Sequence, residues 1–132
     1  MPIEPTDLFT AISHPTRLRC LLLLLRFEEL CVCEFTGALG AAQPHVSRHL
    51  AQLRAAQLVA DRRDGLWIHY RVHPGLADWA WVVLRATAAE TESQSPYQED
   101  AMRVAAQRGS GPHCAPVIGG RLVSTSSSRV KP

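Results

Sequence analysis

Five consecutive leucines, Leu21–Leu25, are the feature that most restricts how this chain can fold. Arg19 and Arg26 close the run on its two sides. Proline is well tolerated in the first turn of a helix, so Pro15 marks a start and the pattern predicts a helix over 15–27. Because that helix is apolar on all its sides, we expect it to lie inside a cluster of other helices. The run is far shorter than the ~18–20 apolar residues needed to cross a bilayer.

Length and composition favour one folded domain. The chain has 132 residues, 46% of them hydrophobic, which suits a single compact core and excludes wholesale disorder. Composition changes near residue 93, so we predict a folded domain over 1–93 and a flexible C-terminal tail over 94–132, with at most one or two helical turns in Tyr97–Gln107. The first ten residues contain no basic side chain and do not resemble a secretory signal. We therefore expect a cytoplasmic protein with no membrane partner.

The rest of the patterned region predicts four further helices and one hairpin. The predicted helices cover 5–12, 15–27, 29–39, 44–56 and 76–92, and the hairpin strands cover 58–63 and 66–72. Asp64-Gly65 is the predicted two-residue turn, because such turns need a positive φ. Gly40-Ala41-Ala42 is the predicted tight turn between the third and fourth helices. This order predicts a mainly α-helical chain with a β-hairpin wing, that is, a winged helix-turn-helix.

The fourth predicted helix has one polar face and one apolar stripe, as a helix that reads DNA requires. The stripe is Val46, Leu50 and Leu53. The candidate DNA-binding residues, on this helix and just before the hairpin turn, are Gln43, His45, Ser47, Arg48, His49, Gln52, Arg54, Arg62 and Arg63. The net charge of the chain is only +2, but five arginines against two aspartates give the stretch 44–73 a local charge of +3. An ordinary solvated helix face beside a hairpin is the alternative interpretation.

Four separate motifs resemble the ArsR/SmtB family of metal-responsive repressors. They are residues 13–17 (SHPTR), 30–34 (LCVCE), 43–50 (QPHVSRHL) and 61–71 (DRRDGLWIHYR). The resemblance implies a homodimer, joined through its terminal helices, that binds double-stranded inverted-repeat operator DNA and leaves it when metal binds. The LCVC element further resembles the arsenic- and antimony-sensing branch of that family. It implies As(III), or alternatively Sb(III), as the effector, with no catalytic cofactor and no enzymatic activity.

Cys31 and Cys33 are the candidate effector ligands. Soft thiolates discriminate soft ions from hard cations, and trivalent arsenic favours three sulfur ligands. On an ideal helix, positions i and i+2 point about 200° apart. We therefore expect both sulfurs to reach one ion only if the start of the third helix distorts, which would disturb the support of the DNA-reading helix.

The third ligand is left open by the sequence. The arsenic-sensing pattern often places another cysteine where this chain has Thr36. Cys114 is the favoured substitute, though only slightly over a site with two thiols. Cys20, within the leucine-rich helix, is more plausible as a buried apolar residue, and solvent or a small-molecule thiol is a further alternative.

Other functions fit the same residues less well. Cys31 and Cys33 are an inert pair in the plainest interpretation, an oxidant sensor in a second, and part of a thiol-disulfide enzyme in a third. The last lacks a βαβ pattern and a base to activate a thiolate. A zinc site on the fifth helix is disfavoured because 76–92 contains no histidine. A DNA-binding protein without any effector is the remaining alternative.

Overall fold

The computed structural model describes residues 3–109, 117–118 and 121–122. Its elements, in chain order, are α1 (Pro5–Ile12), α2 (Pro15–Phe27), β1 (Leu30–Cys31), α3 (Val32–Leu39), α4 (Gln43–Ala55), β2 (Val59–Asp64), β3 (Trp67–Val72), α5 (Asp78–Thr91), α6 (Tyr97–Gly109), β4 (Val117–Ile118) and β5 (Arg121–Leu122). The short strands β4 and β5 pair with each other. The mainly helical fold with a β-hairpin wing is confirmed.

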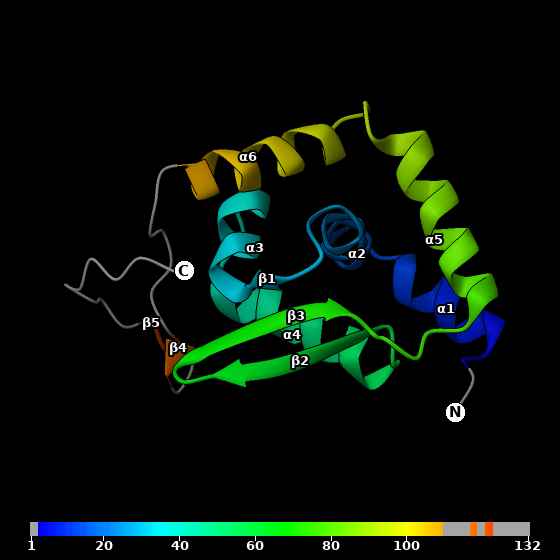
Figure 1. Ribbon diagram of the computed structural model, residues 1–132, viewed down its shortest axis with the longest axis horizontal. Coiled ribbons are helices and arrows are strands. Elements are labelled where there is room, and N and C mark those ends of the chain that lie inside the picture. Colours follow the sequence, from blue (N-terminus) through cyan, green and yellow to red (C-terminus); the bar gives the residue numbers. More distant parts are fainter. Residues whose placement is uncertain (1–2, 110–116, 119–120, 123–132) are drawn as a thin grey trace.

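Helix α2 is the centre of the molecule, as its sequence predicts. Figure 1 looks along it and shows α1, α3, α5 and α6 arranged around it, with the β-hairpin below. Leu21–Leu24 are buried, and so is Cys20, with no exposed surface. Cys20 is thus confirmed as a core residue. The bounds of α1 and α2 are those predicted.

A three-stranded antiparallel sheet forms the wing, in the order β1-β3-β2. Asp64 pairs with Trp67, so the loop of the hairpin is Gly65-Leu66 and not the predicted Asp64-Gly65. Of these two loop residues, only Gly65 has a positive φ, of 64°. Glycine at the first central position is the arrangement typical of type II′ turns, so the hairpin prediction was right and its turn was off by one residue.

The helix-turn-helix is formed by α3, the turn 40–42 and α4. Gly40 ends α3 in the left-handed conformation, with φ 64°, and its N–H donates to the Thr36 carbonyl. Gln43 is the first residue of α4, not its cap, because Ala42 takes the cap position. Val46, Leu50 and Leu53 have no exposed surface, so the predicted inner stripe is confirmed.

Helix α6 corrects the prediction of a flexible tail from residue 94. It is 13 residues long, more than the one or two turns expected, and it packs on α2 and α3. Ala101 and Val104 are buried, and the buried carboxylate of Asp100 accepts two hydrogen bonds from Arg19 of α2, at 2.7 and 2.8 Å. The folded part therefore continues at least to Gly109, because an apolar stripe and an ion pair attach this segment to the core.

No single helix in the described residues is long and apolar enough to cross a membrane. Only α1 and α2 taken together satisfy the length and hydropathy criteria, and they are bent by 102° at the break between them.

Candidate functional site

The cysteine pair lies where the sheet meets the helix-turn-helix. Residues 29–31 were predicted as helix, but Leu30 and Cys31 form strand β1, and Cys31 pairs with His69 of β3. Cys31 is therefore the N-cap of α3, with extended φ and ψ of −89° and 166°, and Cys33 is in the first helical turn. Pairing with the wing keeps Cys31 out of the helix.

This position brings the two sulfurs together. Their Sγ atoms are 3.6 Å apart, so the prediction that they diverge was wrong: it assumed that both residues are helical. With a metal–sulfur bond of about 2.3 Å, as in zinc thiolates, two sulfurs on one ion lie ~3.3–3.8 Å apart. The pair therefore has the spacing that a single soft ion needs, without unwinding of α3.

The oxidation states of the two cysteines differ. Cys31 takes part in no disulfide, whereas Cys33 is disulfide-bonded. Cys114, the favoured third ligand, also lies outside the described residues. Within the described part of the chain, no three His, Cys, Asp or Glu side chains are arranged to hold a metal ion. Burial, followed by the nearby Glu34 carboxylate, raises the pKa of the Cys31 thiol to about 12.

Glu34 is a site residue that the sequence analysis missed. Its Oε1 accepts a hydrogen bond from the Cys31 N–H at 2.9 Å, and the Cys31 sulfur accepts one from the Glu34 N–H. This reciprocal arrangement is a capping box, in which cysteine takes the place usually held by serine or threonine. The sequence signal was available, because Cys31 and Glu34 have the three-residue spacing of that motif.

Arg108 of α6 completes the surroundings of Glu34. Its Nε donates to Glu34 Oε2 at 2.7 Å, and its Nη2 donates to the Glu29 carbonyl at 2.7 Å. Hydrogen bonding to Glu34 raises the pKa of Arg108. Nothing in the local pattern of the sequence links these residues, which are 74 positions apart.

The predicted DNA-reading face of α4 is only partly available to a ligand. Arg48 is exposed, with no carboxylate within ion-pair distance in the described part of the chain. Gln43 and Ser47 are half-buried and hydrogen-bonded to each other at 2.5 Å. Gln52 accepts a hydrogen bond from Arg17 at 2.7 Å, which holds it toward α1 and α2.

His49 corrects one of the DNA-binding predictions. It is only 6% exposed, and its ring lies 4.2 Å from that of His14 and 4.6 Å from that of His45, between ring centres. Burial is the main cause that lowers the pKa of His49, and the charges of His14, His45 and Arg17 lower it further. His49 is thus a packing residue between α2 and α4 and is not placed to read bases. His14 caps α2 by accepting a hydrogen bond from the Thr16 N–H.

The candidate arginines of α4 and of the wing differ in how far their charge is already neutralised. Arg54 is bonded to Asp61 at 2.8 Å, and Arg62 to the Glu29 carboxylate at 2.7 and 2.8 Å. Arg63 is exposed and takes part in no ion pair among the described residues. Arg48 and Arg63 are therefore the candidates that reach a phosphate without first breaking an ion pair.

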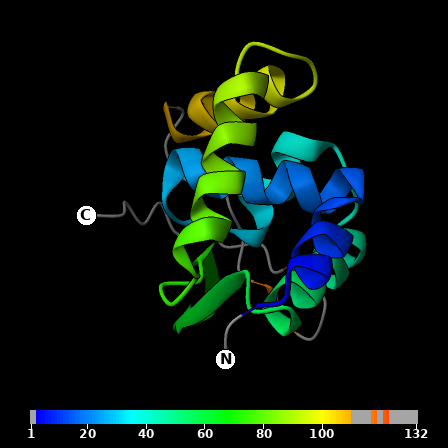
Figure 2. The same ribbon diagram turned by 90° about the vertical axis from the view of Figure 1, so that its right-hand side faces the viewer.

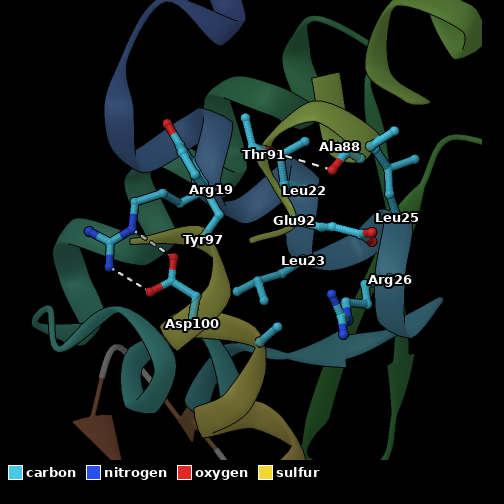
Figure 3. Close-up of a pocket in the computed structure, with 12 residues that line it drawn as sticks. Arg19, Leu22, Leu23, Leu25, Arg26, Ala88, Thr91, Glu92, Tyr97 and Asp100 are labelled. Carbon is cyan, nitrogen blue, oxygen red and sulfur yellow. Dashed lines mark hydrogen bonds and ion pairs between the residues drawn. The ribbon is translucent and has the colours of Figure 1, made fainter. Parts of the chain in front are cut away.

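Helices α1 and α5 lie at one end of the molecule and leave apolar side chains in solvent. Figure 2 shows both helices on the face turned to the viewer, α1 in blue and α5 in green. Phe9 is 52% exposed, Trp79 36% and Val82 67%. A separate cavity of about 270 Å³ lies between α2, α6 and the end of α5, where Figure 3 shows the Arg19–Asp100 pair. None of the predicted site residues lines that cavity.

Comparison with known proteins relates this chain to a family of helix-turn-helix regulators. Residues 14–61 match the family of arsR-type bacterial regulatory proteins. The arsenic resistance transcriptional regulator ArsR1 of Pseudomonas putida is 45% identical over 104 residues, which are 78% of this chain and 79% of that protein. ArsR2 of the same organism is 47% identical over 85 residues, 64% and 74% of the two chains. The crystal structure of the antimony-specific transcriptional repressor AntR aligns with a TM-score of 0.57 and 30% identity, over 67% of this chain and 77% of that one.

Proposed function

The chain belongs to the ArsR family of DNA-binding transcriptional regulators, and from this premise we propose that it is a homodimeric repressor that As(III), or Sb(III), releases from operator DNA. This family regulates transcription and is not a family of enzymes. The observation that carries the effector assignment is the 3.6 Å separation of the Cys31 and Cys33 sulfurs at the junction of the wing and the helix-turn-helix.

The position of Cys31 and Cys33 would connect effector binding to DNA binding. Cys31 shares the β1–β3 ladder with the wing, and Cys33 belongs to α3, against which α4 packs. A change of geometry at the two sulfurs therefore reaches both elements that carry the candidate DNA contacts. An effector shifts DNA affinity only if it binds the DNA-bound and the DNA-free conformations with different affinity. The coupling is reciprocal, so DNA should weaken effector binding by the same factor.

The chemistry of arsenous acid suits a protonated thiol. As(OH)₃ exchanges each hydroxyl group for a thiolate, and the thiol proton leaves with that hydroxyl as water. The raised pKa of Cys31 is therefore no obstacle to this exchange. Cys33 must first be released from its disulfide by an added thiol reductant, which is itself oxidised to a disulfide, so that Cys33 regains a thiol for this exchange. We propose Cys114 as the third thiol, as the sequence suggested.

The DNA-binding surface of the proposed repressor is α4 with the hairpin β2–β3. Arg48 and Arg63 would contact phosphates, and His45, half-buried beside Arg48, is the candidate nearest to them for a base contact. A surface of this kind binds DNA with strong salt dependence, because each neutralised phosphate releases counterions. The site of action would be the cytoplasm, where the operator is.

The dimer surface would be the apolar end formed by α1 and α5. Phe9 of α1 and Trp79 and Val82 of α5 are exposed apolar side chains, and exposed apolar patches typically mark a protein interface. A twofold interface of this kind pairs the same surface from both subunits and suits an inverted-repeat operator.

The deciding experiment is a titration of arsenite into the reduced protein bound to its operator. Release of the DNA at saturating arsenite is the expected result, and the Cys20→Ala variant is the matched control, since Cys20 is buried in the core and should not alter release. DNA that stays bound at saturating arsenite would refute the effector assignment. Replacing Cys114 with Ser tests the third ligand through the affinity for arsenite.

A second function, oxidant sensing by the cysteines, is favoured by one observation. Cys33 is disulfide-bonded in this structure, so this thiol is one that can be oxidised. Peroxide treatment of the reduced protein on its operator separates the two functions. Release by peroxide but not by arsenite would select the oxidant sensor.

A further inference from the structure

Helix α6 is hydrogen-bonded to both ends of α3. The contact at the start of α3 lies next to the cysteine pair. Near the end of α3, Arg103 Nη1 donates to the Ala38 carbonyl at 2.9 Å. Near its start, Arg108 binds the Glu34 carboxylate. Figure 1 shows α6 lying across α3, and the Arg19–Asp100 pair of Figure 3 fixes α6 to α2 as well.

One carboxylate connects α6 with Cys31. The Oε1 atom of Glu34 accepts from the Cys31 N–H at 2.9 Å, and its Oε2 atom accepts from Arg108 at 2.7 Å. The same guanidinium holds the Glu29 carbonyl and lies over the Phe27 ring, 5.4 Å from its centre. Arg108 therefore ties the backbone before Cys31 to the carboxylate after it.

The two residues that this arrangement joins, Cys31 and Glu34, are both buried. Cys31 is 6% exposed and Glu34 5% exposed. Residues covered to that degree offer little surface to an ion in solution until the surrounding atoms move. A buried carboxylate is stable only with hydrogen-bonding partners, so the Arg108 pair stabilises the closed arrangement.

We propose that Glu34 and Arg108 are positioning residues that set the affinity of the effector site, and that α6 loosens from α3 when the effector binds. The inference rests on the proposed function and adds the element that regulates it. Contacts made only in the closed, effector-free form oppose binding by their own free energy. Weakening the Arg108–Glu34 contact should therefore increase the affinity for the effector. Removing a coordinating thiol would have the opposite effect and decrease that affinity.

The test compares two arginine variants of the full, reduced chain, with arsenite as the probe. Arg108→Gln is expected to lower the dissociation constant for arsenite about three- to tenfold, because it removes the partly exposed ion pair with Glu34 and weakens the hydrogen bond to the Glu29 carbonyl. Arg103→Gln removes the attachment at the other end of α3 and should change it less than twofold. Arg108→Lys keeps a charged donor and should restore most of the wild-type value. Hydrogen exchange of the α6 amides in the wild type should accelerate when arsenite is added.

The outcomes separate this inference from the function it rests on. Arsenite binding by the wild type with equal or weaker affinity in Arg108→Gln would overturn the inference and leave the proposed function standing. Equal gains in Arg103→Gln and Arg108→Gln would also overturn it, because they would report general loosening of α6. Unchanged α6 exchange on arsenite binding would refute the release step. A wild type that binds no arsenite would reject both.

Discussion

Cys31 of β1 pairs with His69 of β3, so the first candidate ligand and the wing are parts of one sheet. Its sulfur lies 3.6 Å from that of Cys33, the second candidate, in the first turn of α3. The two candidate ligands thus join the two structural units that carry the candidate DNA contacts. A change of geometry at the cysteine pair would therefore act on both units.

Replacing either thiol of the pair should abolish release and preserve binding. Cys31→Ser and Cys33→Ser remove a soft sulfur ligand but keep a small side chain. Operator affinity without arsenite should stay within about twofold of wild type, because neither side chain lies on the DNA face, while release by arsenite is lost. Fluorescence anisotropy of labelled operator measures both. Wild-type release by either variant would show that the effector binds elsewhere.

Arg48→Ala should weaken operator binding about five- to tenfold and reduce the slope of log affinity against log salt by about one. Arg48 is exposed on α4 and free to reach a phosphate. Arg26→Ala is the control, since Arg26 is exposed on α2, away from the α4 face. Anisotropy titrations at several salt concentrations give both values. An unchanged slope for Arg48→Ala would exclude it as a phosphate contact.

Acid should destabilise the fold through His49. Its pKa in the folded protein is below the ordinary value of 6.5, chiefly because it is buried. The unfolded chain therefore binds the proton at a higher pH than the folded protein does, and the free energy of unfolding decreases as the pH falls below 6.5.

Urea denaturation of wild type and His49→Gln between pH 7.5 and 5 measures the effect. The variant should lose less stability over that range than the wild type does. Parallel pH profiles for His49→Gln and wild type would contradict the assignment.

Val82→Asp should convert the proposed dimer into a monomer. Val82 is 67% exposed on α5, and a carboxylate at that position would be desolvated without a partner in an apolar interface. Sedimentation should give the monomer mass, and operator affinity should fall more than tenfold. Met102→Asp is matched in exposure, at 63% on α6, and should remain dimeric. A dimeric Val82→Asp would place the interface elsewhere.

Asp100→Ala should destabilise the fold by about 1–3 kcal/mol, because it removes a buried carboxylate and leaves the partly exposed Arg19 without that partner. The side chain of Asp100 is 1% exposed and that of Arg19 22%. Glu90→Ala, on an exposed residue of α5, should change stability by less than about 0.5 kcal/mol. Urea denaturation measures both. Equal stability of Asp100→Ala and wild type would mean that α6 adds nothing to the folded domain.

The local pattern of the sequence was sufficient for the elements that local interactions determine. The apolar run of Leu21–Leu25 and the proline before it predicted α2 to the residue, and alternation with Gly65 predicted the hairpin. The polar face of α4 followed from its helical spacing. In each case the residues that decide the structure lie within a few positions of one another, so their order alone carries the information.

Only the tertiary structure decided how distant segments complete the site. Pairing with His69 holds Cys31 in a strand and brings its sulfur to that of Cys33. Packing against His14 buries His49, and Arg108 reaches Glu34 from 74 positions away. These contacts depend on how the helices and the sheet pack in three dimensions, and no periodicity along the chain records which surfaces meet.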